Sequence, residues 1–265
     1  MTESERNLSY PVKKALTAYE GMLPDFPICK MTPAKRFAVW EHLTSYVAER
    51  YRSAGIPEHI IHDTLGEISR LAEAYRIKTG KEGLSKEHVI WLRHIYNAEL
   101  FQIGALQYQI FHMVYLDEEG CGESYMRFTQ EEKKKLPQGT PVVNIHIPPG
   151  ADLSARAVEK SLTEAKSFFQ QFFPNFRPKA FLCYSWLLYP GMLDLLPKES
   201  RILSFASRFR IIGQVSDPYG SCAVKHIYGR RFPEKSAYPQ DTVLQRNAIG
   251  NFSKLGMGCG LIEIA

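Results

Sequence analysis

The sequence lacks the cysteine pairs that mark disulfide frameworks and structural zinc sites. Its five cysteines are an odd number and contain no C-x-x-C pair; they are Cys29, Cys121, Cys183, Cys222 and Cys259. Secreted disulfide scaffolds and zinc modules rely on even, closely spaced sets. The pattern therefore favours reduced thiols, no metal and a cytoplasmic location.

Long apolar runs and concentrated charge of one sign are also missing. Residues 1–6 are polar and no apolar run follows them, which is unlike a signal peptide. No stretch approaches the ~20 apolar residues of a membrane span. The net charge of +5 comes from scattered basic residues, apart from a lysine run at 133–135 that follows two glutamates. We therefore expect no membrane and no nucleic-acid partner.

The residues that are present suffice for a packed core. The 265 residues are 45% hydrophobic and 12% aromatic, and the length suits one large domain or two smaller ones. Apolar positions recur at helical spacing up to about residue 97, and then begin to alternate as in strands. We predict an N-terminal helical domain over residues 1–97 and a second domain over residues 98–265.

Capping signals divide the helical part. A short helix is expected at residues 12–20 of an N-terminal arm. Thr32 and Pro33 are a cap and a first-position proline for a helix that ends at Gly55. The next helix begins after Pro57, and Ser85 caps a third. We thus predict a layer of three helices with short connections.

Strand signals dominate the second part. Residues 100–116 have β character with Gly104 as a break, and residues 118–139 form a charged loop. Further strands are predicted at residues 209–215, 223–228 and 261–264. The glycine cluster at 256–260 is interpreted as a helix stop and tight turn. The predicted fold class is α+β.

A βαβ unit over residues 140–196 organises the chain. Residues 140–147 alternate as a strand that the Pro148–Gly150 turn ends, and Ser154 can cap the helix that follows. Residues 181–188 are almost all apolar and predict a second, parallel strand. The helix N-terminus offers free N–H groups to a phosphate in the loop at 149–154. The alternative is a plain α/β unit that binds nothing there.

The same unit carries a resemblance. The runs Asn144-Ile-His-Ile-Pro-Pro-Gly, Val158-Glu-Lys-Ser-Leu-Thr-Glu-Ala and Phe181-Leu-Cys-Tyr-Ser-Trp-Leu-Leu resemble bacterial acyltransferase domain-containing proteins. That family pairs a helical N-terminal N-acyltransferase domain with a GNAT-like C-terminal domain. The resemblance is strongest over residues 98–265 and looser over the helices.

The resemblance implies a mixed, strongly twisted GNAT-like sheet with flanking helices. Two parallel strands would splay apart and hold the pantetheine arm of an acyl-CoA co-substrate, acetyl-CoA being the first candidate. The diphosphate would rest on the loop and helix N-terminus, at Ile147, Gly150, Ala151, Asp152, Leu153, Ser154 and Arg156. The implied acceptor is an amine on a small molecule or peptide, and the chain could form an oligomer.

The phosphate loop departs from that family pattern. Most GNAT enzymes carry Q/R-x-x-G-x-G/A here, whereas this chain has Pro148-Pro149-Gly150-Ala151-Asp152. Two prolines remove two N–H donors, and the Asp152 carboxylate repels a diphosphate unless it caps the helix. Arg156 and Lys160 could compensate, or could simply be solvated.

Amine acylation needs a base for the amine and an acid for the departing thiolate. His146, on the strand face of Asn144, is the candidate base, and a buried structural histidine is the alternative. Tyr189, after the second strand, is the candidate acid, or else a packing residue. Ser185 shares a strand face with Cys183 and could reach the cleft. Cys183 itself fits an inert core thiol.

Two other functions remain open. A GNAT fold without catalysis would bind a ligand or protein partner, with the helical layer as the contact surface. A metal-dependent HD-type phosphohydrolase would use His59, His62 and Asp63, with His42 upstream. The altered phosphate loop favours the binding module, and the polar face with His146 favours the N-acyltransferase.

Overall fold

The computed structural model describes residues 27–122, 124–217 and 221–264. The helix predicted at residues 12–20 lies outside this part of the chain. Among the described helices, none is both long and apolar enough to cross a membrane.

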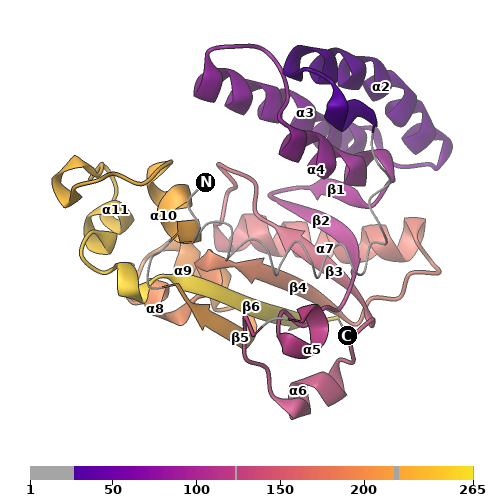
Figure 1. Cartoon of the computed structure of the whole chain (residues 1–265). Coiled ribbons are helices and arrows are strands. Elements are labelled where there is room, and N and C mark those ends of the chain that lie inside the picture. The colour runs from indigo at the N-terminus through magenta and orange to yellow at the C-terminus, as the bar shows by residue number, and fades with distance from the viewer. Residues whose placement is uncertain (1–26, 123, 218–220, 265) are drawn as a thin grey trace.

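Three helices form a layer at one side of the molecule (Figure 1). After the 3-10 turn η1 (Pro27–Lys30) come α2 (Pro33–Ser53), α3 (Glu58–Thr79) and α4 (Lys86–Tyr96). Thr32 accepts a hydrogen bond from the Lys35 amide, and Ser85 forms a capping box with His88. The predicted caps of α2 and α4 are thus confirmed.

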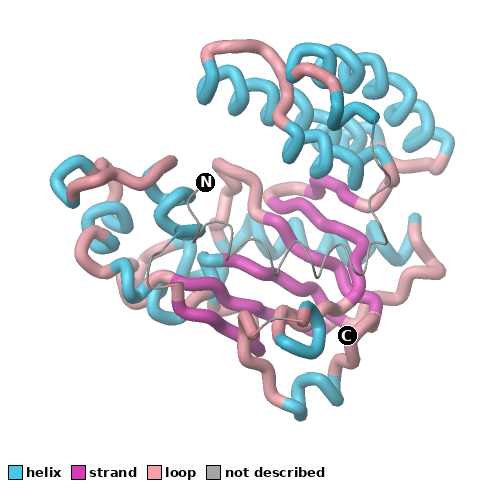
Figure 2. Tube along the Cα trace, in the orientation of Figure 1, coloured by secondary structure: helices cyan, strands magenta, loops and turns pink. Residues whose placement is uncertain are grey.

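A six-stranded mixed sheet forms the centre (Figure 2). Its strands are β1 (Leu100–Ile103), β2 (Leu106–His112), β3 (Pro141–His146), β4 (Ala180–Ser185), β5 (Arg210–Ser216) and β6 (Gly256–Glu263), in the order β1-β2-β3-β4-β6-β5. Among these described strands only β3 and β4 run parallel. Gly104, with φ of +59°, makes the tight turn between β1 and β2. The predicted α+β class and the parallel strand pair are confirmed.

Helices and loops cover both faces of the sheet. α7 (Ala155–Phe172) crosses from β3 to β4, and its apolar face packs against the face that carries Val143 and Phe181. The opposite face is covered near β4 and β6 by the segment with α5 (Glu118–Cys121) and α6 (Gln130–Lys135). α3 and α4 pack against β1 at the sheet edge (Figure 1).

The C-terminal part corrects two sequence predictions. Residues 223–228 are not a strand but belong to α10 (Ser221–Tyr228), which packs against α11 (Val243–Ala248). Ala223 and Val224 are buried while Lys225 and His226 are exposed. Two buried residues followed by two exposed ones fit the period of a helix and not that of a strand. The cue Pro239-Gln240-Asp241 predicts one helix that continues through Leu255, but this segment holds only α11 and the short turn η4 (Phe252–Lys254).

The glycine cluster is not a turn but the first half of β6. A Cβ atom at Gly258 would lie 2.6 Å from the backbone oxygen of Leu188, so only glycine fits this approach. The second βαβ strand also ends earlier than predicted, because residues 186–188 form the 3-10 turn η2 (Trp186–Leu188). The short helices α8 (Pro190–Leu193), α9 (Arg201–Ala206) and η3 (Lys235–Ala237) complete the fold.

The main core is continuous from the helical layer into the sheet. Tyr51 of α2 packs on Phe101 of β1, with ring centroids 5.5 Å apart, and Phe101 packs on Phe168 of α7 at 4.8 Å. The division of the chain near residue 97 stays a prediction.

Candidate functional site

β3 and β4 separate at their carboxyl ends. Their ladder has only two pairs, Val143 with Phe181 and Asn144 with Leu182. Beyond these pairs Ile145 and His146 diverge from Cys183 and Tyr184, although both strands are fully described. The divergence leaves backbone groups facing the gap without a ladder partner. A ligand with amide groups can bind such an edge by supplying the missing hydrogen bonds.

His146 lies at the end of β3, beside this gap. Its Nε2 is 2.9 Å from Gln109 Oε1, an acceptor, which assigns the proton to Nε2 and the lone pair to Nδ1. Burial, and secondarily the neighbouring His94, lowers the pKa of His146 to about 3 even though the side chain keeps some contact with solvent. The imidazole is therefore neutral at physiological pH.

Asn144 has an unpartnered polar atom in the same place. The residue is 5% exposed, and its Oδ1 has no hydrogen-bond partner among the described residues. Its Nδ2 faces the protonated Nε2 of His146 at 3.2 Å. Exchanging the two ends of the amide relieves this contact but places a donor in the unpartnered position. Either way a buried polar group remains for a ligand to satisfy.

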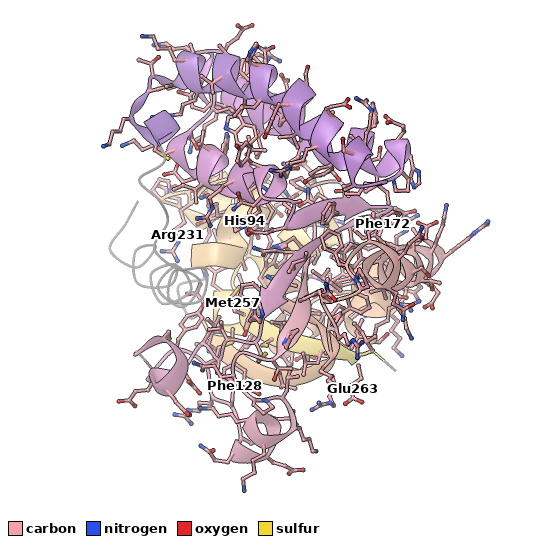
Figure 3. All side chains as sticks on the ribbon, turned by 90° about the vertical axis from the view of Figure 1, so that its right-hand side faces the viewer. His94, Phe128, Phe172, Arg231, Met257 and Glu263 are labelled. Carbon is pink, nitrogen blue, oxygen red and sulfur yellow. The ribbon has the colours of Figure 1, made fainter. Side chains whose placement is uncertain are left out.

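An aromatic ring from the helical layer covers His146. Trp91 of α4 lies edge to face on the imidazole, with centroids 4.7 Å apart, and also contacts His94 at 5.8 Å. His94 lies where the helices meet the sheet (Figure 3). The sequence reasoning missed Trp91 and Gln109. The alternating Gln107 and Gln109 of β2, buried on one strand face, were the available signal.

The loop from β3 to α7 places its polar atoms at the N-terminus of the helix. Ser154 caps α7 through the Ala157 amide at 3.4 Å, and Asp152 accepts from the Ser154 amide at 3.0 Å. The amide and the hydroxyl of Ser154 both donate to the Asp152 carboxylate and lower its pKa, helped by Arg201, which is 3.4 Å away. The predicted capping role of Ser154 is confirmed. The carboxylate of Asp152 is thus balanced by Arg201, which sequence reasoning did not single out.

The other loop residues surround this cap. Gly150 has φ of +80°, which suits its place in the turn after the two prolines. Ile147 and Leu153 pack toward both the main core and the cluster around α8 and α10. Arg156 is exposed on the first turn of α7. Lys160 instead pairs with Glu164 at 3.7 Å.

The remaining candidates lie on the opposite face from His146. The Tyr189 ring packs against Gly191 and Gly256 on the α7 side of the sheet and borders a shallow hollow over β5. His146 shares its face with Gln107, its partner on β2. The structure therefore does not bring Tyr189 next to His146.

The contacts of Ser185 and Cys183 are those of structural residues. The Ser185 hydroxyl accepts from the Leu187 amide at 3.1 Å and caps η2. Burial raises the pKa of the Cys183 thiol to about 12, which suits a core residue. Trp186, which an almost wholly apolar strand would place in the core, is partly exposed and stacks on His226 at 5.8 Å.

The histidines of the metal-hydrolase alternative do not converge. His62 is 89% exposed, and its Nδ1 lies 3.3 Å from the carboxylate of Asp63. In the described part of the chain, no three His, Cys, Asp or Glu side chains are grouped so as to hold a metal ion.

Comparison with known proteins gives a family and a fold. No curated protein matches the chain. An acyltransferase in complex with decanoyl-CoA and teicoplanin is similar in structure, with 21% identity and a TM-score of 0.68 over 86% of this chain and 65% of that one. An acyltransferase in complex with decanoyl-CoA has 19% identity and a TM-score of 0.72 over 99% of this chain and 77% of that one.

This chain therefore spans slightly less than two thirds of the first of these acyltransferases. At such identities the likeness shows the fold. A family model described as the GNAT-like C-terminal domain matches residues 100–261, which is more than half of the sequence. The chain belongs to the family of proteins with a GNAT-like C-terminal domain.

Proposed function

We propose that this protein is an acyltransferase that moves an acyl group from acyl-CoA to an amine. The observation that carries the proposal is the separation of β3 and β4 after two ladder pairs, beside the N-terminus of α7. It is supported by structurally similar acyltransferases in complex with decanoyl-CoA, CoA and teicoplanin. The pantetheine arm would lie in the gap and the diphosphate at the α7 N-terminus, near Arg156 and Arg201.

In the proposed reaction the amine nitrogen attacks the thioester carbonyl carbon. Nδ1 of His146 accepts the proton that the amine loses, the carbon–sulfur bond breaks, and CoA leaves as a thiolate that takes a proton from the Tyr189 hydroxyl. The products are an amide and CoA. Because His146 and Tyr189 lie on opposite faces of the sheet, this path requires the thioester to be reached by the amine from the His146 side while its sulfur faces Tyr189.

The low pKa of His146 shapes its part in this proposal. The imidazole is always unprotonated near neutral pH, so it is ready to accept a proton. A weak base gives a small driving force for proton transfer, and its contribution should lie near the low end of general-base catalysis, about a hundredfold. Asn144, with its unpartnered amide atom, would hydrogen-bond to the acceptor amine beside it.

We propose a small-molecule or peptide amine as acceptor, and leave the acyl length to experiment. The first test is release of free thiol from acetyl-CoA, octanoyl-CoA and decanoyl-CoA in the presence of an amine panel. Amine-dependent thiol release with any donor supports the proposal. Thiol release that does not depend on amine, or none with any donor, contradicts it.

The alternative, a GNAT-fold binding module without catalysis, is favoured by one observation. Asp152 and Pro148–Gly150 occupy the place where a phosphate loop would present N–H groups. In that case CoA would not bind, and a ligand would occupy the Asn144–His146 region alone. Binding of CoA by the purified protein separates the two functions.

A further inference from the structure

A buried carboxylate joins the helical layer to the sheet next to His146. Glu67 of α3 is only 3% exposed. Its carboxylate accepts from the Arg70 guanidinium through both oxygens, from Trp91 Nε1–H at 2.9 Å and from Gln107 Nε2 at 3.0 Å. The donors come from α3, α4 and β2. One side chain thus fixes three elements in a single arrangement.

The Trp91 ring is the part of this arrangement that reaches the site. Glu67 holds the indole through its N–H, and the ring edge lies on the imidazole of His146, 4.7 Å between centroids. Gln107, the third partner of Glu67, is also the ladder partner of His146 across β2 and β3. Two separate paths, one aromatic and one through the sheet, therefore lead from Glu67 to His146.

A purely structural role would not require an ionised carboxylate in the interior. An ionised carboxylate in the interior has a large desolvation penalty, which its partners repay only with good geometry. Exposed pairs of the same type occur on the same helix, for example Glu73 with Arg76 at 2.6 Å. The buried Glu67 carboxylate instead fixes the orientation of two side chains. Trp91 contacts His146, and Gln107 is the ladder partner of His146.

We propose that Glu67 is a positioning residue that fixes Trp91 against His146, so that the helical layer builds one wall of the acceptor side of the site. This inference rests on the proposed function of His146. Near His146 lie Trp91 and His94 from α4 and the uncharged Gln109 and Asn144 from the strands. Glu67 and Arg70 of α3 lie behind Trp91.

The test compares Glu67→Gln and Trp91→Phe with the matched control Glu73→Gln, whose carboxylate pairs with an arginine three residues on but is exposed. Glutamine adds a donor where three donors already converge, so Trp91 should lose its fixed orientation. We expect kcat for acyl transfer to fall by about tenfold or more in both site variants, with unchanged KM for acyl-CoA. Glu73→Gln should match the wild type.

The second readout is independent of activity. In protein labelled with 15N-histidine, the ring resonances of His146, assigned by comparison with His146→Gln, should shift in Glu67→Gln and Trp91→Phe and stay in place in Glu73→Gln. Unmoved His146 resonances in folded Glu67→Gln would overturn the positioning role, and Trp91→Phe shows how large the shift is when the indole itself is changed. If the wild type shows no acyl transfer but the resonances shift as expected, the proposed function fails and the positioning role stands. Glu67→Asp, which keeps the charge but shortens the side chain that reaches Trp91 Nε1, decides the matter if Glu67→Gln does not fold.

Discussion

His146 is the residue on which the proposed chemistry depends. Its strand position and its partnership with Asn144 could be predicted from the alternation of residues 142–147. Its low pKa could not, because burial beneath Trp91 and proximity to His94 arise from a helix some fifty residues away in the sequence. An ordinary histidine pKa near 6.5 would suit a general base, and the structure lowers it to about 3.

Replacing His146 by alanine should lower turnover by about a hundredfold, because the amine loses its proton acceptor. The KM for acyl-CoA should change little, since the ring lies on the acceptor side. Free-thiol release measures both constants. His62→Ala, on an exposed histidine of α3, is the matched control and should retain full activity. Equal turnover of the His146→Ala variant and the control would remove His146 from the mechanism.

The stability of the fold should also report on His146. Its pKa falls from the ordinary 6.5 in the unfolded chain to about 3 in the folded one. Between these values the unfolded state binds more protons, so this contribution is fully present above pH 6.5 and is lost as the pH falls toward 3. The free energy of unfolding, measured in urea, should therefore fall more steeply with decreasing pH for the wild type than for His146→Gln across this window. Parallel curves for the two proteins would contradict the depressed pKa.

Asn144 offers a third test at the residue scale. Its buried amide carries an atom without a partner among the described residues, and Asn144→Leu fills similar space without any polar atom. Removing an unsatisfied buried group should leave the free energy of unfolding equal or slightly higher, while acceptor KM rises about tenfold through the lost hydrogen bond. Urea unfolding and acyl-transfer kinetics measure the two effects. A variant with wild-type acceptor KM would exclude Asn144 from acceptor binding.

At the scale of elements, capping signals and the βαβ unit were predictable because they depend on neighbours in sequence. Thr32, Ser85 and Ser154 cap the helices as expected. The failures lie where tertiary contacts decide. Residues 223–228 alternate in a way that fits a strand or a helix, and their packing against α11 makes them helical. The glycines of β6 allow Leu188 and Phe209, which are distant in sequence, to lie close to the strand.

The β6 glycines give a test of that account. A side chain at Gly258 would collide with the backbone of Leu188 at 2.6 Å, so Gly258→Ala should lower the free energy of unfolding by about 2 kcal/mol or more. Gly66→Ala in α3 is the control, since no atom lies within 4 Å of the added Cβ, and it should be neutral or stabilise by about 0.5–1 kcal/mol. Urea unfolding measures both. Equal stability of the two variants would contradict the packing described for β6.

At the scale of the whole molecule, the helical layer and the sheet share one core and meet at the candidate site. The general architecture, a helical N-terminal part followed by a GNAT-like sheet, could be predicted from periodicity and resemblance. The meeting of α4 with β2 and β3 could not, because Trp91 and Glu67 carry no local signal of the partners they contact. The proposed acceptor side of the site therefore forms only where the helical layer packs against the sheet.

The central claim is that the gap between β3 and β4 binds acyl-CoA despite the proline-containing loop. Calorimetric titration of the purified protein with acetyl-CoA and decanoyl-CoA, with CoA as comparison, tests it most directly. We expect saturable binding in the micromolar range for at least one acyl-CoA, with competition by CoA. The absence of binding for all three at millimolar ligand would show that the gap is no CoA site and would leave the binding module as the remaining function.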